Sequence, residues 1–197
     1  MSAVRNWNSA AAASRGALLF VIADDLEPAA DWDMTLRTIV GTLDPQKFPF
    51  AIGLADDRGT LMRHPVISRR FYSQLGLFAP EFTGVYCDTE ITLRAYNKAV
   101  VLNGQRLSLL HRRPNNTDGF QWSESQTRLN APEEYEIGLR ILLDKWGRVR
   151  RATRHDYFEP RPGTTVPTVQ AALWRIRLRL LGVTSGNARR SRSLIRT

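Results

Sequence analysis

The 197-residue chain has one cysteine, no long apolar run and fewer acidic than basic residues. The single cysteine, Cys87, excludes an internal disulfide framework and is typical of a reducing compartment. No apolar run approaches the ~20 residues that a membrane-spanning helix requires. The alanine-rich start also lacks the pattern of a secretory signal. We therefore expect a cytoplasmic protein, and peripheral contact with a membrane remains open.

The formal net charge of +9 belongs mainly to the end of the chain. Its arginines cluster after residue 147, which favours a globular domain at 1–160 followed by a linker, a basic amphipathic segment and a disordered tail at 161–197. The alternating arginines and apolar residues at 174–180 suit anionic lipid headgroups or a docking helix. Binding of nucleic acid through this tail is the less favoured interpretation.

Helix and strand patterns alternate along the first part of the chain. Leu18–Ile22 is a continuous apolar run of the kind found in the middle of a sheet covered on both faces. Asn103-Gly104 between apolar runs predicts a hairpin turn, and the polar residues 115–127 predict a loop. The patterns predict helices at 4–15, after Pro28, at 69–75, at 89–98 and from Pro132, and a strand at 50–54. This alternation indicates an α/β fold, in which ligands bind beyond the carboxyl ends of the strands.

Two adjacent carboxylates, Asp24 and Asp25, follow the apolar run directly. Carboxylate oxygens are the ligands that Mg²⁺ and Mn²⁺ prefer, and such an ion can bridge the phosphates of a nucleotide. On their own, two aspartates in a loop are more often a solvated turn. The two aspartates therefore indicate a metal site only in combination with the residues around them.

A fixed order of features surrounds the pair: an Asn- and Ala-rich helix, Gly16, the apolar strand, the two aspartates and Pro28. This order resembles the family 2 type of glycosyltransferase with the GT-A fold. The resemblance extends to about residue 114 through HPVISRRFY at 64–72, LGLF at 75–78 and YCDTEITLRA at 86–95. It implies a mixed central sheet flanked by helices, and metal-dependent, inverting transfer of a sugar from a nucleotide-sugar donor to a hydroxyl. The acceptor hydroxyl would belong to a glycan, a lipid-linked molecule or a protein.

The resemblance also implies roles for single residues. Asp24 and Asp25 would hold Mn²⁺ or Mg²⁺ and thereby the donor, and His111 would complete the metal shell. Asp88 would be the base that deprotonates the acceptor hydroxyl, with a helix N-cap as the alternative of equal weight. Glu90 and Trp122 would contact the acceptor, although Glu90 also suits the positive end of a helix. A hydrogen-bonded structural role is the alternative for His111.

The chain departs from the family at its start, because members open with a strand and βα units that hold the nucleobase and ribose. We therefore expect an incomplete GT-A fold that lacks most of this pocket. A truncated, non-catalytic remnant or interaction module is the alternative function. An unpaired strand edge would favour a homo-oligomer or a partner chain.

Overall fold

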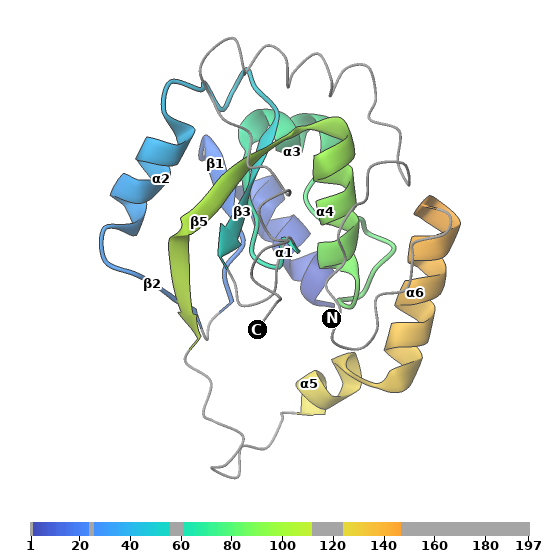
Figure 1. The fold of residues 1–197 in the computed structure, drawn as a ribbon. Coiled ribbons are helices and arrows are strands. Elements are labelled where there is room, and N and C mark those ends of the chain that lie inside the picture. The colour runs from blue at the N-terminus through green and yellow to red at the C-terminus, as the bar shows by residue number, and fades with distance from the viewer. Residues whose placement is uncertain (1, 24–25, 56–60, 112–123, 147–197) are drawn as a thin grey trace, which may run out of the picture.

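The structure is a computed structural model that describes residues 2–23, 26–55, 61–111 and 124–146 (Figure 1). The predicted linker and basic tail at 161–197 lie outside these residues. The strands are β1 (Leu18–Phe20), β2 (Leu26–Pro28), β3 (Phe50–Ala55), β4 (Val66–Ser68) and β5 (Val100–His111). The helices are α1 (Ala3–Ala13), α2 (Trp32–Val40), α3 (Arg69–Leu75), α4 (Cys87–Lys98), α5 (Glu124–Leu129) and α6 (Pro132–Trp146).

The strands form one mixed sheet in the order β1-β4-β3-β5-β2. Strand β4 is antiparallel to both β1 and β3, and β3 is parallel to β5. Strands β1, β3 and β5 therefore run in the same direction, whereas β4 and β2 run in the opposite one. The expected α/β class, with a mixed sheet flanked by helices, is confirmed.

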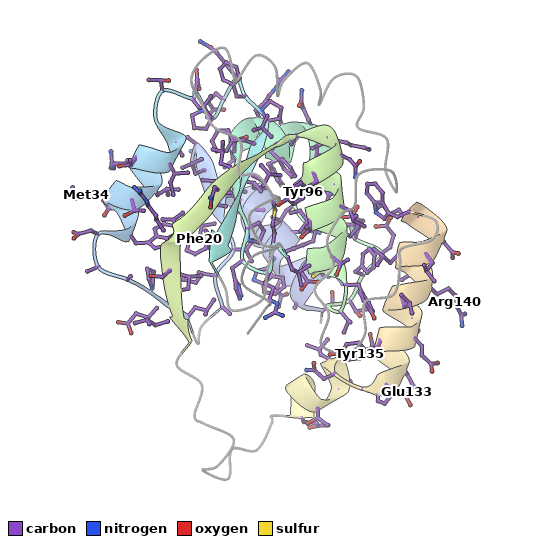
Figure 2. The ribbon with its side chains drawn as sticks, viewed as in Figure 1. Phe20, Met34, Tyr96, Glu133, Tyr135 and Arg140 are labelled. Atoms are coloured by element: carbon purple, nitrogen blue, oxygen red, sulfur yellow. The ribbon has the colours of Figure 1, made fainter. Side chains whose placement is uncertain are left out.

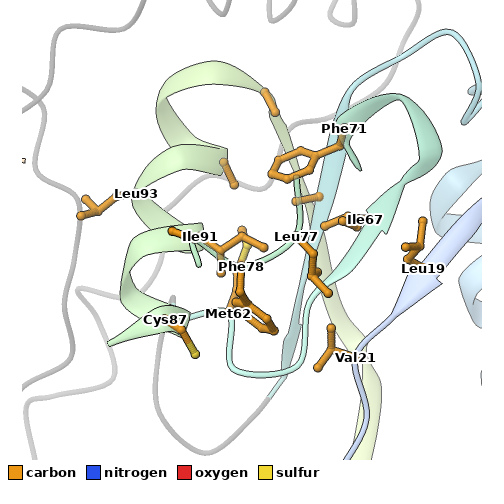
Figure 3. Close-up of a cluster of buried hydrophobic side chains, with 14 of the residues drawn as sticks. Leu19, Val21, Met62, Ile67, Phe71, Leu77, Phe78, Cys87, Ile91 and Leu93 are labelled. Carbon is orange, nitrogen blue, oxygen red and sulfur yellow. The ribbon is translucent and has the colours of Figure 1, made fainter. Parts of the chain in front are cut away.

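Helices cover both faces of this sheet. On one face, α1, α3 and α4 enclose a core that includes Leu19, Ile67 and Phe71 (Figure 3). On the other face, α2 covers a second core around Phe50, Ile52 and Leu102. Alternate residues of a strand point to opposite faces, so Leu19 joins the first core while Leu18 and Phe20 join the second. The two cores explain why the strands are apolar on both sides.

Strand β1 lies at an edge of the sheet, so the predicted position in its middle is wrong. The apolar run is covered on both faces, as expected, but that pattern does not report how many neighbours a strand has. The hydrogen bonds from Arg69 N to Ala17 O (2.8 Å) and from Val21 N to Pro65 O (3.1 Å) fix the ladder with β4. The alternation of an antiparallel ladder then directs the backbone polar groups of Leu18 and Phe20 away from β4. No strand among the described residues pairs with that side.

The predicted hairpin turn at Asn103-Gly104 is also wrong, because β5 runs unbroken through both residues. Gly104 lies opposite Leu54 of β3, next to a register shift in the ladder. A Cβ atom added to Gly104 would lie 2.5 Å from the carbonyl oxygen of Gly53 and 2.7 Å from Cγ2 of Ile52. The glycine is thus required by the close approach of a neighbouring strand rather than by a turn.

Other boundaries differ from the sequence expectations in smaller ways. Helix α5 occupies residues 124–129, where a loop was expected up to residue 127. Strands β2 and β4 were not expected, since each has only three residues. The glycines at the ends of α2 and α3, Gly41 (φ 56°) and Gly76 (φ 76°), terminate their helices as expected. None of the described helices is long and apolar enough to cross a membrane.

The close contact at Gly104 predicts the effect of adding a methyl group. Gly104→Ala should lower the free energy of unfolding by about 1–3 kcal/mol, because the added carbon overlaps the β3 backbone. Gly53→Ala is the matched control on the neighbouring strand, where the nearest atom to the new Cβ is Cε of Met62 at 3.9 Å. Denaturant unfolding of both variants measures the difference, and equal losses would contradict the proposed overlap.

Candidate functional site

The carboxyl ends of β1, β3 and β5 lie together along one edge of the sheet, which runs across the strands and differs from the side edge formed by β1. The candidate site lies at this edge of strand ends. Because β4 runs in the opposite direction, its first residues lie at this same edge. Helix α4 is followed at once by β5 and runs back along it, so the first turn of α4 also faces this edge (Figure 1). Three strand ends, the starts of β4 and β2 and one helix start therefore converge there.

The residues on either side of Asp24 and Asp25 are fixed by pairing. Val21 N donates to Pro65 O, just before β4, and Leu26 is in register with His111 at the end of β5. Leu26 N also donates to Ala23 O (3.2 Å), so the described residues on the two sides of the pair lie close together. The fold thus brings His111 to the strand that begins directly after Asp25.

The segment before β4 connects the end of β1 with the first turns of α4. Met62 N donates to Oγ1 of Thr92 (2.8 Å), and this hydroxyl donates to the backbone oxygen of Asp88 (2.6 Å). Arg63 follows Met62, and its positive charge acts on the Asp88 carboxylate. Asp88 is therefore joined through two hydrogen bonds to the segment that also holds Val21.

Asp88 is the second residue of α4, so its predicted role as the N-cap is wrong. The N-cap is Tyr86, which adopts a left-handed conformation (φ 65°) that is uncommon for a residue with a bulky side chain. The helix begins at Cys87, two residues before the predicted start at residue 89. Asp88 instead accepts a hydrogen bond from the backbone N–H of Thr89 at Oδ1 (2.7 Å).

The surroundings of Asp88 change its acidity. Burial raises the pKa of its carboxyl above the ordinary value of 3.8, and this effect outweighs the opposing contributions of the Thr89 N–H and of Arg63. Burial and the charge of Asp88 also raise the pKa of the neighbouring Cys87 thiol well above 9.0. The thiol is thus kept neutral, which agrees with a packing role for Cys87 and not with a nucleophile.

Glu90, the predicted acceptor contact, has a fully buried side chain. Its Oε2 accepts hydrogen bonds from Nη2 (2.7 Å) and Nε (3.1 Å) of Arg94, and Lys145 Nζ lies 3.5 Å from its Oε1. The carboxylate therefore faces two cations inside the protein. This arrangement gives Glu90 a structural task, and its predicted contact with an acceptor remains a prediction.

Arg94 and Lys145 were not singled out as site residues from the sequence. Most helical arginines are exposed, but Arg94 is buried and pairs with the acid Glu90. Its guanidinium donates to Leu75 O and, at 2.6 Å, to Leu77 O. The four-residue spacing of Glu90 and Arg94 on one helix was the available signal. Lys145 gave no such signal, because its partners lie far away in sequence.

Several predicted site residues lie outside the described set. These are Asp24, Asp25, Trp122 and the side chain of His111. Among the described side chains, no three His, Cys, Asp or Glu residues gather as metal ligands. Two hollows of about 410 and 480 Å³ are lined by residues of α1 and its neighbours, and none of the candidate site residues lines either of them.

The tryptophans in the described segments pack as expected from their apolar helix faces. Trp32 stacks on Phe20 with ring centroids 4.6 Å apart, and Trp146 packs against the first core.

Comparisons of the chain with models of known protein families, with curated proteins and with solved structures found no match. The residues and geometry of the site are therefore the basis for a function of this chain.

The raised pKa of Asp88 predicts an unusual effect on stability. The folded chain binds the proton of this carboxyl more tightly than the unfolded chain, so ionisation of Asp88 lowers the free energy of unfolding at neutral pH. Asp88→Asn keeps an oxygen for the Thr89 N–H and should raise Tm at pH 7. The gain should shrink as the pH falls through the raised pKa and vanish below about 3.8.

Thermal unfolding of both proteins between pH 3 and pH 8 measures this effect. Asp33→Asn is the control, because Asp33 is an exposed acid in the first turn of α2 and should give no comparable gain. A constant loss of stability in Asp88→Asn at every pH would show instead that the carboxylate is a structural contact.

Proposed function

We propose that the chain is a metal-dependent glycosyltransferase with a fold of the GT-A type. In this proposal a sugar moves from a nucleotide-sugar donor to a hydroxyl of a glycan, a lipid-linked molecule or a protein. Asp24 and Asp25, with His111, hold Mn²⁺ or Mg²⁺ and the diphosphate of the donor, and Asp88 is the base. A peripheral contact with a membrane would suit a lipid-linked acceptor.

One observation supports this proposal most strongly. The ladder between β2 and β5 places His111 opposite Leu26, the residue after Asp25, although the two are far apart in sequence. Strands β1 and β5 run in the same direction, so both motifs follow strands that end at the same edge. In α/β sheets this edge is where ligands bind.

The proposed ligands have the right chemistry for the ion. Two carboxylates and one imidazole form a set of oxygen and nitrogen donors that accepts Mn²⁺ and, with more water ligands, Mg²⁺. A cation held there supplies Lewis-acid stabilisation of the negative charge on the leaving diphosphate. The remaining steps belong to residues of the chain.

Asp88 has the properties of a general base for this reaction. Its raised pKa makes the carboxylate a better proton acceptor than an ordinary aspartate, and the positive charge of Arg63 favours the ionised form that a base requires. Asp88 would accept the proton of the acceptor hydroxyl as its oxygen attacks the anomeric carbon. The sugar–phosphate bond then breaks on the opposite side, which inverts the configuration.

Calorimetry tests the metal site directly. Mn²⁺ is titrated into the full chain first, and a nucleoside diphosphate is then titrated with and without Mn²⁺. We expect binding of the diphosphate to depend on Mn²⁺ and to weaken at least tenfold in Asp25→Ala. Asp33→Ala removes an exposed aspartate from α2 and serves as the matched control with unchanged binding.

Two results would contradict the proposal. Diphosphate binding that is independent of Mn²⁺, or is unchanged in Asp25→Ala, would remove Asp25 from the site. Absence of any metal or diphosphate binding would favour the alternative function as a non-catalytic interaction module.

A further inference from the structure

One side of α6 runs along residues 81–90, the segment that leads into α4 and forms its first turn. The ring of Tyr135 meets the ring of Tyr86 edge-on, with centroids 6.2 Å apart. Glu134 Oε2 accepts a hydrogen bond from Thr83 Oγ1 (2.6 Å), and Lys145 binds Glu81 (3.1 Å). Gly138 lies four residues after Glu134, three after Tyr135 and seven before Lys145, so these four residues share one side of α6, which we call the clasp face.

The clasp face approaches Tyr86 most closely at Gly138. A Cβ atom on Gly138 would lie 3.0 Å from Cδ2 of Tyr86 and 3.1 Å from the oxygen of Val85. Tyr86 is the residue with a left-handed backbone, a conformation that persists only where the surroundings enforce it. The contacts of Tyr86 with Gly138 and Tyr135 on one side hold it in this conformation.

The clasp face also reaches the buried charge of α4. Lys145 lies between Glu81 of the connecting segment and Glu90 of the first turns of α4. The Glu90 side chain is fully buried, whereas Lys145 is partly exposed. The positive charge of Lys145 therefore lies between the buried carboxylate and the protein surface. Lys145 thereby ties α6 to both ends of the segment 81–90.

We propose that the clasp face of α6 is a positioning element, and that Gly138 and Lys145 fix the first turn of α4 and with it Asp88. The role of Asp88 as a base rests on the proposed function. The position of Asp88 in the structure does not depend on that function. The connecting segment between Gly76 and Tyr86 contains no helix or strand, so it cannot set the start of α4 by itself. Tertiary contacts must do so, and α6 supplies contacts to residues 81, 83, 85, 86 and 90.

The carboxyl titration of Asp88, followed by carbon NMR of the full chain without substrate, reads out this position. In Gly138→Ala the new methyl group displaces Tyr86, and in Lys145→Met the tie to Glu90 is lost. Both changes should loosen the burial of Asp88 and shift its pKa down towards 3.8. Loss of the positive charge alone would move the pKa of Asp88 in the opposite direction, because a nearby cation favours the carboxylate.

Two further variants provide controls. Arg140→Met removes a positive charge from the outer side of α6, where Arg140 is exposed (Figure 2), and should leave the titration unchanged. Lys145→Arg keeps the charge and should retain most of the wild-type titration. If transfer activity is established, the same two positioning variants should lower kcat at least tenfold with little change in KM.

The two proposals fail in different ways. A wild-type titration of Asp88 in folded Gly138→Ala and Lys145→Met would overturn the positioning role, whatever the activity. An upward shift in Lys145→Met with no shift in Gly138→Ala would reduce Lys145 to a source of charge and also overturn it. Should Lys145→Met not fold, the outcome for Gly138→Ala decides. Failure of metal binding would remove the proposed function and leave the positioning result intact.

Discussion

The structure depends on the burial of one charge, the carboxylate of Glu90. A buried carboxylate is costly unless cations and hydrogen bonds compensate it, so its surroundings cannot be rearranged freely. Arg94 satisfies one oxygen and uses its remaining donors on backbone oxygens at residues 75–77, which follow α3. Lys145 approaches the other oxygen from α6. One side chain therefore links α4, the end of α3 and α6, and removal of either cation would leave the buried carboxylate with a single cationic partner.

The ion pairs of the buried Glu90 carboxylate also restrict the candidate site, because Glu90 lies within one helical turn of Asp88. Glu90 and Asp88 belong to the first turns of α4, so fixing one carboxylate limits where the other can lie. Two local costs coincide there, the left-handed backbone of Tyr86 and the raised pKa of Asp88. Neither favours folding, and each needs the rigid surroundings that Glu90, Arg94 and α6 provide. Costs of this kind gather at functional sites more often than elsewhere, which is why Asp88 is a stronger candidate than its sequence alone suggested.

The sequence predicted the features that depend on local chemistry. The alternation of helices and strands, the glycine ends of α2 and α3 and the start of α6 at Pro132 were all readable, since each reflects a preference of neighbouring residues. The errors share a different cause. Asn103-Gly104 is a good turn signal, yet Gly104 is needed because the backbone of Gly53 lies against it. The apolar run Leu18–Ile22 indicates that both faces of β1 are buried. It does not indicate that β1 lies at an edge of the described sheet. Asp88 resembles an N-cap, but α4 begins before it, at Cys87, with Tyr86 as the N-cap.

The candidate site shows the same division between local and distant information. Each motif could be found in the sequence, because carboxylates after an apolar strand or at a helix start are local patterns. Their convergence could not be found there, since it follows from strand directions and from the ladder that sets Leu26 opposite His111. A sheet in which β1 ran the other way would keep every motif and place Asp24 and Asp25 at the far edge. The direction of β1 relative to β5 is therefore the structural fact on which a shared site depends. This direction is set by β4, which pairs through three residues with β1 and through two with β3.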